Sequence, residues 1–177
     1  MRKLRRPILL AFVMISLFSA LGAQSKDGEN RLTPIEIESV TPIAPGAGTS
    51  GLAGIKTRVL KGDPTRPGLY TIQLTIPANT TIQAHDHPDD RIATVISGTW
   101  YIGYGNKFDD KKLKALPPGS FYTEVPHDMH FAMTRDTPVV VMITGYGPTG
   151  TKYFEANANY RVIDTKGISV RRNRETK

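Results

Sequence analysis

The chain has 177 residues, of which 39% are hydrophobic and 22% are charged. These proportions are typical of one globular domain with a substantial core, and they exclude a disordered chain. The sequence contains no cysteine, which excludes a disulfide scaffold, a thiolate metal site and a cysteine nucleophile.

Residues 1–23 have the pattern of a secretory signal peptide. Basic residues at the start precede an apolar run at 8–18, and small residues follow. The apolar run is short for a transmembrane span, so we predict cleavage after Gly22 or Ala23 and export to the periplasm or the medium. An uncleaved N-terminal anchor is the alternative interpretation.

The charge of the exported part is modest. The formal net charge of +7 includes four basic residues of the signal peptide, which has no acidic residue, so +3 remains. The C-terminal segment 161–177 is rich in arginine, and we interpret it as a solvated basic tail. We therefore expect a small-molecule partner and no nucleic acid, and no membrane once the signal peptide is removed.

Short apolar segments separated by turns fill most of the remaining chain. Residues 24–52, rich in Gly, Pro and Ser, form a predicted N-terminal arm with one strand candidate at Ile35–Val40. Between 53 and 160, apolar and polar side chains alternate in short runs, as they do in half-buried antiparallel strands. These runs are 55–60, 69–77, 81–87, 91–96, 99–104, 120–125, 129–134, 139–146 and 151–155.

One segment, Lys107–Leu116, is a weak helix candidate that ends at a Pro-Pro-Gly turn. The segment after 155 has no clear pattern. About nine short strands with turns every eight to twelve residues predict an all-β domain, either an antiparallel sandwich or a small barrel.

His85 and His87 lie on one of the predicted strands, one residue apart. Because side chains alternate between the two faces of a strand, both imidazoles point the same way. Two neutral imidazoles on one face are half of a transition-metal site. An exposed loop tip is the alternative interpretation of this pair.

The spacing around this pair resembles the first motif of the cupin superfamily. That motif is a glycine, His-x-His, a glutamate three or four residues later, and a glycine after six more. Here His85 and His87 are followed by Arg91 and Gly98. The register matches, but an arginine stands where the family has its glutamate.

The second cupin motif, a Pro-x-Gly turn followed by a histidine, matches 117–119 and His130. The glycine that precedes this histidine in the family is absent, and Asp128 lies in that region. The resemblance covers residues 68–147. It implies a cupin-type double-stranded jelly-roll barrel with a site at its mouth, and a homodimer formed through an edge or an exchanged N-terminal strand.

Parity along the strand places Arg91 on the same side as the two histidines. A cation beside a divalent metal is repelled unless a negative group lies between them. Glu124 is the best candidate for that group, either as a metal ligand or as an ion-pair partner of Arg91. Alternatively, Arg91 clamps a substrate carboxylate, or it turns to solvent while Asp89 or Asp90 takes the place near the metal.

We therefore predict a site for one divalent metal (Fe, Mn, Ni, Cu or Zn) with the ligands His85, His87, Glu124 and His130. A satisfied core histidine is the alternative for His130. Arg91 and His127 are predicted catalytic residues, Arg91 to orient an anionic group and His127 as an acid or base, although His127 also fits a simple loop histidine.

The alternation in 100–104 places Trp100, Ile102 and Tyr104 on one face, where core or dimer packing is expected. The resemblance favours a dioxygenase-like oxidoreductase acting on a small molecule at the metal. A non-enzymatic metal or ligand sensor, and a barrel that binds no metal, are the alternatives, because a fold does not determine a reaction.

Overall fold

The computed structural model describes residues 29–44, 50–154, 159–163 and 169–173. The predicted signal peptide lies outside the described residues. Within them, no helix is both long enough and apolar enough to cross a membrane.

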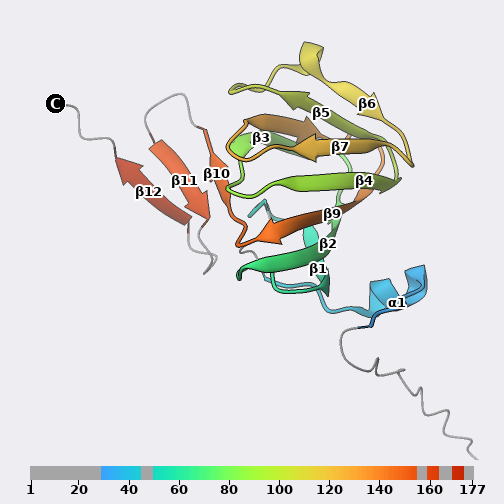
Figure 1. The fold of residues 1–177 in the computed structure, drawn as a ribbon. Helices are drawn as coiled ribbons and strands as arrows, with labels where there is room; N and C mark the ends of the chain where they lie inside the picture. Colours follow the sequence, from blue (N-terminus) through green and yellow to red (C-terminus); the bar gives the residue numbers. More distant parts are fainter. Residues whose placement is uncertain (1–28, 45–49, 155–158, 164–168, 174–177) are drawn as a thin grey trace, which may run out of the picture.

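Two antiparallel sheets face each other and enclose the core (Figure 1). The first sheet has the order β1 (Lys56–Lys61), β2 (Gly68–Ile76), β9 (Val139–Gly147), β4 (Arg91–Ser97), β7 (Phe121–Glu124). The second sheet has the order β12 (Ser169–Asn173), β11 (Asn159–Ile163), β10 (Thr151–Tyr153), β3 (Thr81–Asp86), β8 (His130–Met133), β5 (Trp100–Tyr104), β6 (Lys114–Leu116). The predicted all-β, double-sheet jelly roll is confirmed.

Alternation along the strands builds the core. On β2, Tyr70, Ile72, Leu74 and Ile76 are all buried and point between the sheets. The inward residues of β4 and β9 complete the layer, and each fully buried side chain of this size contributes about 1.5–3 kcal/mol.

The turn between β4 and β5 requires glycine. Gly98 has φ +73°, and a Cβ added there would lie 2.3 Å from the carbonyl oxygen of Pro138. The backbone conformation and the lack of space therefore both explain the motif glycine.

The strand predicted at Ile35–Val40 is wrong, because Pro34–Ser39 forms a short helix, α1. Local chemistry decides this conformation. The Thr33 hydroxyl accepts the Glu36 N–H at 3.4 Å, while the Glu36 carboxylate accepts the Thr33 N–H at 2.6 Å. This capping box, with Pro34 at the first helical position, outweighs the β-preference of the isoleucines.

The helix predicted at Lys107–Leu116 is also wrong in most of its length. Only Asp110–Lys112 is helical, as a single 3₁₀ turn (η2), and the next residues form β6. Pairing of β6 with β5, which opposes Leu116 to Trp100, overrides the weak helical preference. After the last predicted strand, β11 and β12 form a further antiparallel pair that extends the second sheet (Figure 1).

Candidate metal centre

Three histidines gather inside one end of the barrel. His85 and His87 come from β3 and its C-terminal end, and His130 begins β8, where it is paired in register with His85. All three are buried, and one ring nitrogen from each lies within 4.8 Å of those of the other two. The structure therefore brings together the three predicted histidine ligands.

A β-bulge in β3 aims the histidines inward. Ile82, earlier on the strand, also points into the core, although it is separated from His85 by an odd number of positions. The pairing of β3 with β8 shifts by one residue between Ile82 and His85. A bulge of this kind turns the following side chains to the other face, which is the reason both positions are internal.

The hydrogen bonds of the three rings define their tautomers. His85 Nδ1 lies 2.7 Å from the carbonyl oxygen of Gln83, and His87 Nδ1 lies 2.5 Å from that of Gly150. His130 Nδ1 lies 3.3 Å from the carbonyl oxygen of Asp128, at the position where the family glycine is absent. A carbonyl only accepts, so each Nδ1 carries the proton and each Nε2 presents a lone pair.

These lone pairs suit a metal ion. The Nε2 atoms of His87 and His130 are buried and have no hydrogen-bond partner among the described residues. Backbone carbonyls that fix the distal nitrogen are the usual support of metal-bound imidazoles. The residues present therefore fit a metal held by three Nε2 atoms.

Burial keeps the imidazoles neutral. Burial lowers the pKa of His85 to about 3. Burial and the charge of Arg91 lower the pKa of His87, and burial also lowers that of His130. Neutral imidazole is the form that binds metal.

Glu124 reaches the histidines from the opposite sheet and is also paired with Arg91. The two residues oppose each other in the register of β4 and β7. Arg91 Nε donates to Glu124 Oε2 at 2.7 Å, and an Arg91 terminal nitrogen donates to the same oxygen. Glu124 Oε2 also lies 3.6 Å from His87 Nε2, and Oε1 lies 3.6 Å from His130 Nε2.

This pair remains charged inside the protein. Burial alone would raise the pKa of the Glu124 carboxyl, but the charge of Arg91 and its hydrogen bond hold that pKa below its usual value. Burial also disfavours the charged form of Arg91, but the charge of Glu124 holds the pKa of Arg91 above its usual value. The centre therefore contains an ionised carboxylate whose charge is balanced by a fixed cation.

Two further alternatives are settled by the positions of the side chains. Arg91 is only 3% exposed and lines the cavity, so the interpretation in which it turns to solvent is wrong. Asp89 and Asp90 do not line the cavity. Asp89 is buried elsewhere and accepts a hydrogen bond of 2.7 Å from Tyr70, while Asp90 is exposed.

His127 does not join the other histidines. Its side chain is exposed and does not line the cavity, so the structure gives no support to a role as acid or base. Its backbone adopts φ +62°, and its N–H donates to the carbonyl oxygen of His87 at 2.8 Å. The residue therefore helps to hold the loop after β3 and does so through its main chain.

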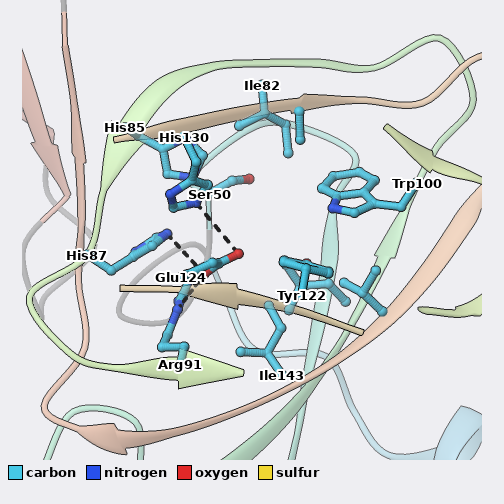
Figure 2. Close-up of a pocket in the computed structure, with 13 residues that line it drawn as sticks. Ser50, Ile82, His85, His87, Arg91, Trp100, Tyr122, Glu124, His130 and Ile143 are labelled. Atoms are coloured by element: carbon cyan, nitrogen blue, oxygen red, sulfur yellow. Dashed lines mark hydrogen bonds and ion pairs between the residues drawn. The ribbon is translucent and has the colours of Figure 1, made fainter. Parts of the chain in front are cut away.

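The cavity has two ends of different character (Figure 2). The histidines, Arg91 and Glu124 form one end, and Trp100 and Tyr122 lie at the other with aliphatic side chains. The empty volume is about 410 Å³, counting the space open to solvent at the mouth. Tyr122 was not among the predicted site residues, although it stands two residues before Glu124 on β7 and so shares its inward face.

No protein-family model and no curated protein matches the sequence. Solved structures do, among them a sugar phosphate isomerase of the cupin superfamily from Silicibacter pomeroyi. The two chains share 15% identity and superpose with a TM-score of 0.50 over 75% of this chain and 86% of the other. The chain has the cupin fold.

Other cupin-like structures are similar as well. An RmlC-like cupin from Shewanella frigidimarina shares 17% identity over 67% of this chain and 90% of its own, with a TM-score of 0.48. An uncharacterized protein with a double-stranded β-helix domain from Klebsiella pneumoniae shares 17% sequence identity, with a TM-score of 0.49. The match covers 77% of this chain and 99% of the Klebsiella chain. The 15% identity with the Silicibacter protein establishes the shared fold alone.

In the motif that this chain resembles, a glutamate stands at the position of Arg91, and here an acid reaches the same place from the neighbouring strand. The register of β4 and β7 makes Glu124 the direct cross-strand partner of Arg91. A carboxylate therefore stands beside the histidines in spite of the substitution, but it arrives together with a compensating cation.

Proposed function

We propose that this protein is a cupin that binds one divalent transition metal and acts there on a small molecule. The observation that supports the proposal is the set of three buried imidazoles, each with Nδ1 directed at a backbone carbonyl. With the imidazoles neutral, three Nε2 lone pairs converge on one place. In the proposal, His85, His87 and His130 hold the metal.

Glu124 completes the proposed site, with Arg91 as the residue that positions it. Arg91 holds Oε2, while Oε1 is the oxygen on the side of His130. When bound, the metal would act as a Lewis acid and offer open positions to a small molecule. Because Arg91 is occupied by Glu124, we assign it to orienting the carboxylate and no longer to clamping a substrate anion.

Metal binding to the untagged protein tests this proposal. After removal of metal by a chelator, we expect titration with Zn²⁺ or Ni²⁺ to give one ion per chain, measured by mass spectrometry of the dialysed protein. His85→Ala and His130→Ala should abolish this binding. His127→Asn is the matched control, because it removes an exposed histidine while asparagine tolerates the positive φ.

A separate pair of variants tests Glu124 as the fourth metal ligand. Glu124→Gln should weaken metal binding more than Asp90→Asn, because Glu124 lies beside the histidines and Asp90 is exposed. The reverse order would overturn the assignment of Glu124. Substoichiometric metal in the unmodified protein, unchanged by His85→Ala, would overturn the site itself.

For the reaction, we propose a dioxygenase-like oxidation of a small compound. It is supported by a cavity that opens beside the histidines and has aromatic and aliphatic walls. Oxygen uptake by protein loaded with Fe²⁺, Mn²⁺, Ni²⁺ or Cu²⁺, measured over small carboxylates and phenols, tests it. Stoichiometric metal without turnover would favour the alternative, a non-enzymatic metal or ligand sensor.

We also propose that the protein is exported and acts as a homodimer. Export rests on the pattern of residues 1–23, and N-terminal sequencing of the protein recovered from cells should begin at residue 23 or 24. An intact N-terminus at Met1 would contradict cleavage.

A further inference from the structure

The end of the cavity away from the histidines contains a buried hydrogen-bond donor. Trp100 is 5% exposed, and its Nε1–H has no partner among the residues that the structure describes. Figure 2 shows the indole nitrogen on the side of the ring that faces the cavity. The Tyr122 hydroxyl lies near the indole, but without the geometry of a hydrogen bond from Nε1.

Apart from the Tyr122 hydroxyl, the walls around this donor are apolar. Leu74, Ile82, Val141 and Ile143 line the same cavity and contribute only hydrocarbon. The cation of the cavity, Arg91, lies at the other end and is occupied by Glu124. A second anionic group placed beside Trp100 would therefore be buried without a counter-charge.

The cost of leaving the donor unpaired indicates which kind of ligand group fits beside Trp100. A buried N–H without a partner costs about 1–3 kcal/mol, and native proteins satisfy nearly all such groups. A charged acceptor at this end would lose its hydration without gaining an ion pair, which costs more. A neutral oxygen acceptor on an apolar body satisfies the indole and fits the walls.

We propose that this end of the cavity is a ligand subsite for a compact apolar group that carries a neutral acceptor oxygen, such as a carbonyl. Trp100 Nε1–H donates to that oxygen, and the aliphatic side chains contact the hydrocarbon. The proposal deepens the proposed function, because it describes the substrate that would reach the metal. None of the subsite's side chains is a proposed metal ligand, so it can be tested without metal.

The chain has one tryptophan, which makes the test direct. In ¹⁵N-labelled protein, the single indole N–H resonance reports on Nε1 alone. The probes are cyclopentanone, cyclopentene and cyclopentanecarboxylate, which compare a neutral acceptor, the bare hydrocarbon and a charged acceptor on one ring. We expect cyclopentanone to move the indole proton downfield in metal-free protein, cyclopentene to move it little, and the carboxylate to bind more weakly than the ketone.

Variants separate the hydrogen bond from packing. Trp100→Phe keeps an aromatic ring without the donor, and should weaken cyclopentanone about fivefold relative to cyclopentene, the value for one net hydrogen bond. Tyr122→Phe should leave the preference for the ketone in place. The proposal is overturned if the indole resonance does not respond to cyclopentanone, whether or not the ketone binds elsewhere. It is also overturned if Trp100→Phe prefers cyclopentanone over cyclopentene as strongly as the unmodified protein does.

The same samples keep the two proposals apart. If Zn²⁺ does not bind but the indole still responds to the ketone, the metal site fails and the subsite stands. If Zn²⁺ binds with one ion per chain and the indole resonance does not respond to the ketone in either the metal-free or the Zn²⁺-loaded protein, the subsite fails and the metal site stands.

Discussion

Arg91 and Glu124 face each other across β4 and β7, and both side chains are almost completely buried. Removing one member of such a pair leaves a charge in the interior without compensation. The pair therefore matters for stability as well as for the charge beside the histidines, and the two contributions can be measured separately in metal-free protein.

We expect Glu124→Gln to lower the free energy of unfolding by about 3–5 kcal/mol, because it isolates the Arg91 guanidinium. Arg91→Glu should be at least as harmful, since it places two carboxylates opposite each other. The reversed pair, Arg91→Glu with Glu124→Arg, should recover most of the loss. Urea unfolding followed by circular dichroism measures all three, and additive losses in the double variant would contradict the pairing.

At the residue scale, spacing and parity predicted much of the centre. Arg91 lies inside with the histidines as predicted, but it begins β4 in the first sheet while the histidines belong to the second, so alternation along one continuous strand is not the reason. The bulge before His85 could not be seen in the sequence. Whether Glu124 pairs with Arg91 depends on the register of β4 with β7, which is a long-range property. His127 has a left-handed backbone, and its side chain is exposed away from the other histidines.

At the scale of elements, turns determine where the strands end. Gly98 follows β4 and Gly119 precedes β7, and both have positive φ, +73° and +85°. They differ in their surroundings. A Cβ at Gly98 would lie 2.3 Å from the Pro138 oxygen, whereas a Cβ at Gly119 would have no atom within 4 Å.

This contrast gives a matched pair of variants. Gly119→Ala should destabilise the protein by about 1–2 kcal/mol, the cost of the left-handed conformation alone. Gly98→Ala should cost clearly more, because the clash with the backbone of Pro138 adds to the same conformational term. Thermal unfolding of both variants measures the difference, and equal losses would show that the contact at Gly98 relaxes without cost.

The same scale shows where local patterns mislead. Alternating runs predicted the strands of the barrel, because one face of each is buried. Pro34–Ser39 has isoleucines that favour a strand, but no residue of α1 is buried, so the capping box decides. In β6 the reverse holds, since pairing with β5 overrides the helical preference of the sequence.

At the scale of the whole molecule, β1 carries outward charged residues, among them Lys56 and Arg58, at one edge of the first sheet, and the outer face over the other four strands is uncharged. Its exposed large side chains are Leu69, Ile92, Ile96, Phe121 and Tyr146. Cross-strand pairs join them, with Leu69 opposite Tyr146 and Phe121 opposite Thr94. Over β2, β9, β4 and β7, the outward positions between them are threonine, glutamine, methionine and valine, with no charge at any of these described positions.

Such a face suits a second copy of the chain. Around a two-fold axis the same surface meets itself, so any charge near the axis would face its own copy, and the part of the face over β2, β9, β4 and β7 has none. Exposed apolar patches of this kind mark interaction sites. The edge at β1 is less available for the edge-strand dimer that the resemblance implied, because Ile43 already bridges to Thr57 there.

We therefore expect a dimer in sedimentation velocity, and expect the double change Ile92→Lys and Tyr146→Lys to convert it to monomer. Both side chains are about half exposed or more, at 47% and 65%, so the subunit fold should survive, with near-UV circular dichroism as the check. Thr81→Lys is the matched control, an exposed position on β3 in the other sheet, and should leave the dimer intact. The dimer fails as a proposal if the unmodified protein is monomeric. The assigned face fails if the double lysine variant remains dimeric, or if Thr81→Lys dissociates the dimer equally.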